Sequence, residues 1–324
     1  MENNSQYNQW FSYGFGSCAL LLMLFGVSVF PSFQFLIVSF VILIIVSCYF
    51  VPTSWLVILP STIVLVDWSS WTGRFIFNEF DLIVFSIIAI GFLKPLDSAN
   101  NLKLSGKTTQ TAIKFKKYIL PLIFLILVVI PFNFESFISL LSQPLFANPY
   151  YLDAYHIKVG KGFVYGFVLS ILFVRQFKQN SDSVINHLAL GSCLGSLGLF
   201  TLVLWERGTL FQLFNSTNWW ALANSFLDFT SSYRVTALVS DMHTGGEAYD
   251  GIILTLIPLN LLGFFWFKNH SLRMLCVCAL MAVCYCVLVG FTRASYFASA
   301  LSIGCFILLH SFVVFKKQNQ DQYS

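Results

Sequence analysis

Charged side chains are scarce in this sequence, and their scarcity excludes most soluble folds. Asp, Glu, Lys and Arg make up 10% of the 324 residues, 57% of the residues are hydrophobic, and the mean hydropathy is +0.76. A soluble chain of this length cannot bury so many apolar residues, because the buried share of the surface rises only slowly with size. The composition therefore predicts an integral membrane protein.

Other features are missing as well. The net charge of +4 is modest, and the basic residues form no stripe of the kind that binds nucleic acid. Residues 1–10 contain Glu2 and no Lys or Arg, which argues against a cleaved signal peptide. All eight cysteines lie in apolar runs, which argues against a disulfide framework.

One group of cysteines has a spacing that resembles metal-ligand spacing: Cys276, Cys278, Cys284 and Cys286. Residues two apart on a helix point to different faces, and no histidine stands nearby. We therefore expect these thiols to pack as small hydrophobes, and we expect neither a metal nor another cofactor.

Ten apolar runs have about the length of a membrane-spanning helix, which is roughly 20 residues. They are Phe11–Phe30, Phe33–Phe50, Pro52–Trp68, Phe77–Leu93, Tyr118–Phe134, Gly162–Val174, Val184–Trp205, Ala248–Phe267, Leu272–Phe291 and Ala294–Phe315. We predict an all-α, polytopic transmembrane helix bundle of about ten helices. The run from Gly162 is short, so an earlier start is open, with Lys158 and Lys161 snorkelling outward.

The basic residues predict the orientation of the bundle. They gather in four segments that fall on one side of the membrane: 94–117, 175–178, 268–273 and 316–317. Because cytoplasmic loops are enriched in Lys and Arg, both termini are predicted to be cytoplasmic. We expect one integral membrane domain, with an N-terminal part (1–117), central helices (118–205), a C-terminal core (206–315) and a polar, disordered tail that begins at Gln318.

Two outer loops are long, and the second, residues 206–247, carries a group of charged and titratable residues: Glu206, Arg207, Asp228, Arg234, Asp241, His243 and Glu247. Its first two residues, Glu206 and Arg207, are interpreted as a local pair at the interface. The stretch Ala221–Phe229 is interpreted as a short helix in the membrane interface, with a buried loop segment as the alternative.

Three short motifs are expected to meet on the outer side. Arg234 lies in Ser-Ser-Tyr-Arg-Val-Thr; His243, Gly245 and Gly246 lie in Asp-Met-His-Thr-Gly-Gly-Glu; Arg293 lies in Gly-Phe-Thr-Arg-Ala-Ser. The helices after the second and third motifs start on the outer side, and helix starts attract anions. Glycines allow close approach of a ligand, and arginines bind phosphates in a bidentate manner.

We therefore predict a phosphate or diphosphate site formed by Arg234, Arg293, Gly245 and Gly246. Plainer interpretations stay open. Arg293 can snorkel at a helix end, Arg234 can form an ion pair in its loop, and the two glycines can serve only as a turn.

The run Tyr-Arg-Val-Thr-Ala-Leu-Val-Ser-Asp-Met-His-Thr-Gly-Gly, followed by a helix with Pro258 and by Gly-Phe-Thr-Arg-Ala-Ser-Tyr, resembles the core of the O-antigen ligase and O-antigen polymerase family. These are polytopic glycosyltransferases of the bacterial inner membrane. The likeness covers mainly Glu206 to Leu309 and rests on short motifs.

The resemblance implies metal-independent transfer of a glycan from undecaprenyl diphosphate to an acceptor sugar, at the periplasmic face, during surface polysaccharide assembly. It implies that Arg234 and Arg293 hold the diphosphate. The partners that it implies are membrane lipids and other assembly proteins.

The sequence departs from the family pattern after the Thr-Arg-Ala-Ser helix. Relatives continue into an outer loop with a histidine proposed as the general base, whereas this sequence stops at Ser324, before such a loop. His243 is the candidate base that remains. Alternative functions are a flippase or other transporter, and an inactive homologue that binds the lipid diphosphate.

Overall fold

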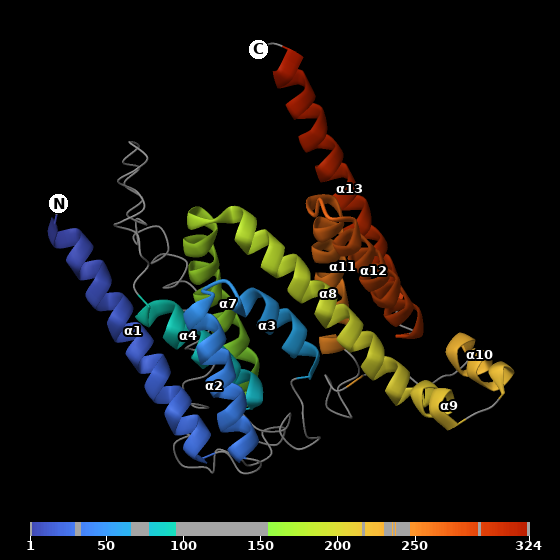
Figure 1. Cartoon of the computed structure of the whole chain (residues 1–324), viewed down its shortest axis with the longest axis horizontal. Helices are drawn as coiled ribbons and strands as arrows, with labels where there is room; N and C mark the ends of the chain where they lie inside the picture. Colours follow the sequence, from blue (N-terminus) through green and yellow to red (C-terminus); the bar gives the residue numbers. More distant parts are fainter. Residues whose placement is uncertain are drawn as a thin grey trace. The chain divides into compact units, whose positions relative to one another are not determined.

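The computed structural model describes residues 2–29, 34–65, 78–94, 155–215, 218–229, 235, 237, 247–290 and 293–322. Within these ranges all regular secondary structure is helical, with eleven α-helices and one 3₁₀ helix (Figure 1). The predicted all-α class is confirmed for this part of the chain. The chain divides into two compact units, residues 1–55 with 71–181, and residues 56–70 with 182–324.

The first unit contains four described helices: α1 (Glu2–Val29), α2 (Gln34–Phe50), α4 (Glu79–Leu93) and α7 (Tyr155–Gln179). Helices α1 and α2 both pack on α4 (Figure 1). Met23, Ile37, Val41 and Leu82 form the buried apolar cluster between them.

The second unit contains most of α3 (Trp55–Thr62), the 3₁₀ helix η1 (Ile63–Leu65), α8 (Ser181–Glu206), α9 (Thr209–Asn215), α10 (Trp219–Leu227), α11 (Glu247–Trp266), α12 (His270–Val289) and α13 (Arg293–Gln322). Helix α11 packs on both α12 and α13 (Figure 1). A buried apolar cluster joins α8, α11 and α12 through residues such as Leu199, Ile253 and Val283.

Five described helical stretches are long and apolar enough to cross a membrane: Phe11–Ser28, Ser181–Glu206, Tyr249–Trp266, His270–Val289 and Arg293–Phe312. Helix α2 contributes a shorter apolar stretch. Many of their large apolar side chains, among them Phe297 and Leu308 of α13, face outward. Because such a surface needs lipid around it, the chain is a membrane protein. The number of ten spans and the side of the termini stay predictions.

Several helix boundaries differ from the ends of the predicted apolar runs. Helix α1 begins at Glu2, well before Phe11, and helix α7 begins at Tyr155, the earlier start that the sequence left open. Helix α13 continues to Gln322, so the expectation of a disordered tail from Gln318 is wrong for residues 318–322. The run Pro52–Trp68 is not one long α-helix as far as it is described, since α3 ends at Thr62 and a 3₁₀ turn follows. Pro60 explains the break, because it lacks an amide donor and crowds the carbonyl four residues earlier. The predicted helix Tyr118–Phe134 lies outside the described residues.

The cysteines of α12 point to different faces, as expected. Cys276 and Cys286 are buried, and Cys278 and Cys284 are exposed. The Sγ atom of Cys276 lies 3.4 Å from that of Cys193 in α8, so this thiol helps the two helices to pack.

Helix α8 also carries polar groups into the apolar core. Asn260 of α11 accepts a hydrogen bond from Ser192 (3.1 Å) and donates one to Ser196 (2.7 Å), and all three side chains are buried. A buried amide without partners would be costly in a membrane, so these bonds favour one rotational setting of α8 against α11.

Two glycines let α3 approach the backbone of α8 closely. A methyl group added at Gly191 would overlap with the carbonyl oxygen of Leu56, and one added at Gly195 would overlap with the carbonyl oxygen of Pro60. Leu56 lies four residues before Pro60, and because proline has no amide hydrogen, the Leu56 carbonyl lacks its usual helical partner. Small residues four apart are the usual means of close helix contact in membranes.

We expect Gly195→Ala to destabilise the second unit, because the added methyl group meets backbone atoms that cannot rotate away. Overpacking of this kind typically costs about 1–3 kcal/mol. The measurement is the midpoint of thermal unfolding in detergent. Gly251→Ala is the matched control, since nothing lies within 4 Å of a methyl group at that helical position. Equal losses in the two variants would contradict the close contact.

Candidate functional site

The starts of α11 and α13 lie at the same end of the second unit. The connections between α11, α12 and α13 are only a few residues long, so the three helices alternate in direction. Tyr249, near the start of α11, donates a hydrogen bond to the carbonyl of Cys286 (2.9 Å). Tyr296, near the start of α13, donates one to the carbonyl of Leu288 (2.8 Å). Both helix starts therefore adjoin the last turns of α12, and in the predicted topology this is the outer end.

Arg293 is the predicted site residue that the structure describes. It is the first residue of α13, and its side chain is exposed. Arg234, His243, Gly245 and Gly246 lie outside the described residues. Val235, which directly follows Arg234 in sequence, is buried in the cluster that includes Tyr249 and Val289.

Glu206 and Arg207, at the end of α8, bind different parts of the outer loop. The Oε2 atom of Glu206 accepts a hydrogen bond from the amide of Ala237 (2.6 Å), a residue with a left-handed φ of 52°. Left-handed backbone is uncommon for alanine, and the carboxylate contact stabilises it. Arg207 donates to the carbonyls of Ser225 (3.2 Å) and Asp228. Each of the two residues thus holds a separate loop segment, and the local Glu206–Arg207 pair stays a prediction.

The described partners of the Arg207 guanidinium are uncharged groups. Its described partners are two backbone carbonyls and the ring of Tyr285, whose centroid lies 6.0 Å from the guanidinium carbon. None of these groups carries a formal charge, and an aromatic face attracts a cation only weakly. The end of α8 thus adds a second described arginine to the predicted outer side of this unit.

Tyr285 of α12 anchors the outer loop and was not singled out from the sequence. Its ring stacks on Phe226 of α10 with centroids 4.5 Å apart, and its hydroxyl donates to the carbonyl of Phe226 (3.0 Å). Phe200 of α8 meets the same ring edge-on at 5.4 Å. A single tyrosine inside an apolar run is weak evidence by itself, since the partner that it anchors is remote in sequence.

The first unit contains a separate polar cluster around Asp81. The side chain of Asp81 is 0% exposed and lies 2.6 Å from Nζ of Lys161. It also accepts hydrogen bonds from the hydroxyl of Tyr165 (2.8 Å) and from the amide of Asn78 (2.7 Å). Asn78 and Asp81 cap the start of α4 reciprocally. The expectation that Lys161 snorkels outward is therefore wrong, because a buried carboxylate holds it.

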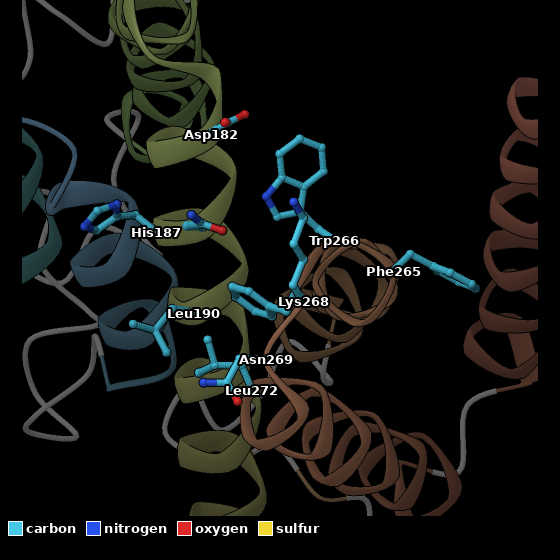
Figure 2. Close-up of a pocket in the computed structure, with 10 residues that line it drawn as sticks. Asp182, His187, Leu190, Phe265, Trp266, Lys268, Asn269 and Leu272 are labelled. Carbon is cyan, nitrogen blue, oxygen red and sulfur yellow. The ribbon is translucent and has the colours of Figure 1, made fainter. Parts of the chain in front are cut away.

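A cleft of about 730 Å³ opens at the other end of α12. Figure 2 shows Asp182 and His187 on α8, with Trp266, Lys268 and Asn269 on the side of α11 and α12. The Nδ1 atom of His187 lies 2.7 Å from the carbonyl oxygen of Ser183, so this ring is tied to its own helix. Since Arg293 follows the last turn of α12, the cleft is remote from the predicted diphosphate site along that helix.

Comparison of the chain with family models, with curated proteins and with solved structures finds no match.

We expect Asp81→Asn to destabilise the protein strongly, because it leaves the partly buried Lys161 ammonium beside a neutral amide. Breaking one side of a buried ion pair typically costs about 3–5 kcal/mol. Lys161→Met should also destabilise the protein, and the double variant Asp81→Asn with Lys161→Met should regain much of the loss. The measurement is a double-mutant cycle of thermal unfolding midpoints in detergent. Strictly additive losses would contradict a direct interaction.

Proposed function

We propose that this protein transfers a glycan from undecaprenyl diphosphate to an acceptor sugar at the outer face of the bacterial inner membrane. The reaction is of the O-antigen ligase or polymerase type and belongs to surface polysaccharide assembly. The observation that supports the proposal best is the meeting of the α11 and α13 starts beside the end of α12, with Arg293 exposed at the first position of α13.

Helix starts and an arginine together suit a leaving diphosphate. In the transfer, the acceptor hydroxyl oxygen bonds to the anomeric carbon, the bond from that carbon to the diphosphate breaks, and the hydroxyl proton passes to a base. Negative charge grows on the diphosphate as it leaves, so donors that already point to it lower the barrier. We assign this role to Arg293 together with Arg234, Gly245 and Gly246, and the role of base to His243.

The anchored outer loop supports the same proposal. Glu206, Arg207 and Tyr285 hold described parts of the segment that carries the Arg234 and His243 motifs. Catalytic groups on a loop need such fixed attachments, because small displacements of reacting groups slow a reaction strongly.

We expect Arg293→Ala to lower the rate of glycan transfer by about 10²-fold, the typical loss when one donor to a developing anion is removed. The transfer rate of Arg293→Lys should lie between those of Arg293→Ala and the wild type, since an ammonium keeps the charge and loses the bidentate geometry. The measurement is transfer from undecaprenyl-diphosphate-linked glycan in proteoliposomes that contain the full chain.

The matched control is Lys268→Ala, which removes an exposed cation at the other end of α12. It should transfer glycan at the wild-type rate. Equal rates in Arg293→Ala and the wild type would remove Arg293 from the mechanism, and a preparation without any transfer would count against the enzymatic function as a whole.

A second candidate function is transport of a lipid-linked or other anionic substrate, and the Asp81–Lys161 pair favours it. The pair lies near the starts of α4 and α7, and ion-paired residues inside membrane proteins often belong to transport pathways. The same proteoliposomes distinguish the two functions. Movement of labelled lipid-linked glycan between leaflets, without transfer to an acceptor, would favour the carrier.

A further inference from the structure

The stretch of residues 209–227 has no charged side chain, although it lies in the predicted outer loop. It contains no Asp, Glu, Lys or Arg, and Arg207 and Asp228 flank it. An uncharged stretch of about this length would suffice to cross a bilayer. Its structure decides whether it crosses.

The two ends of this stretch lie together. Arg207, just before it, donates hydrogen bonds to the carbonyls of Ser225 and Asp228 at its other end. The Oγ1 atom of Thr209 lies 3.0 Å from the Oγ atom of Ser225. Gly208 has a left-handed φ of 71°, which lets the chain turn sharply as α8 ends. Helices α9 and α10 therefore form a hairpin that starts and ends at one side of the membrane.

One face of the hairpin is attached to the protein. Phe226 of α10 stacks on Tyr285 of α12, and the hydroxyl of Tyr285 donates to the Phe226 carbonyl. Large aromatic side chains cover the rest of the hairpin and stay exposed: Phe211 at 71%, Phe214 at 82%, Trp219 at 80% and Trp220 at 78%. These four exposed aromatic groups on two neighbouring helices are apolar surface that water does not favour.

We propose that the α9–α10 hairpin lies in the lipid leaflet that meets the end of α8, with Phe211, Phe214, Trp219 and Trp220 at the boundary of headgroups and acyl chains. Helix α8 is a membrane-crossing candidate, and its last turn carries the exposed Trp205, so the aromatic surface continues a lipid-facing one. Tryptophan prefers this boundary, and the absence of charge from residues 209–227 suits it. The hairpin would anchor the outer loop to the membrane, whichever function the protein has.

The test is quenching of tryptophan fluorescence in nanodiscs that contain the full chain. One quencher is phosphatidylcholine brominated on its acyl chains, and the other is iodide in the buffer. Compared with the wild type, the variant W219F/W220F should lose a component of the emission that brominated lipid quenches and iodide does not. If the double variant fails to assemble, W219F and W220F are measured one at a time.

W55F is the control, because the Trp55 side chain is buried and its Nε1 donates to Gln176 (2.7 Å). It should leave the lipid-quenched component unchanged. Two results would overturn the proposal. Loss of an iodide-quenched component in W219F/W220F would place these residues in water, and loss of a component that neither quencher reaches would indicate cover by protein, such as a second copy of the chain.

Discussion

The hydrocarbon core of the bilayer is the constraint on which this structure depends. No water is available there to satisfy backbone amides and carbonyls, so a spanning segment must pair them internally. The described part of the chain is accordingly helical, and its helices turn many large apolar side chains outward. Lipid takes over the role that a buried core has in a soluble protein. Polar side chains buried among the described helices therefore need hydrogen-bond partners, and several find them on another helix.

Those few polar partners determine how the helices are set. Asp81 binds Lys161 across α4 and α7, and Asn260 binds two serines across α8 and α11. Arg207 binds carbonyls at the far end of the α9–α10 hairpin. In each case apolar packing alone would allow many rotations and translations of one helix relative to the next. A hydrogen bond near 3 Å allows only a narrow range. The glycines of α8 act in the same direction, because close backbone contact also limits sliding.

Several polar contacts of the second unit lie at the end where α11 and α13 begin. Glu206, Arg207 and Tyr285 hold loop segments there, and Arg293 stands exposed at the start of α13. The proposed glycan transfer uses this end, since an anionic lipid-linked substrate needs cationic groups near a membrane surface and a loop that is held in position. The Asp81 cluster belongs to the other unit and motivates the transport alternative.

Long apolar runs were sufficient to predict the all-α class and the existence of α1, α2, α4, α7, α8, α11, α12 and α13, because membrane helices are set by the length and polarity of local sequence. Helical periodicity likewise predicted that the cysteines of α12 point to different faces. Only the tertiary structure decided that a buried carboxylate holds Lys161 and that helices α9 and α10 form a hairpin. These outcomes depend on partners that are remote in sequence, and hydrogen bonds to such partners are directional. The apolar pattern of a helix predicts that it lies in lipid, but it does not specify which helix packs beside it.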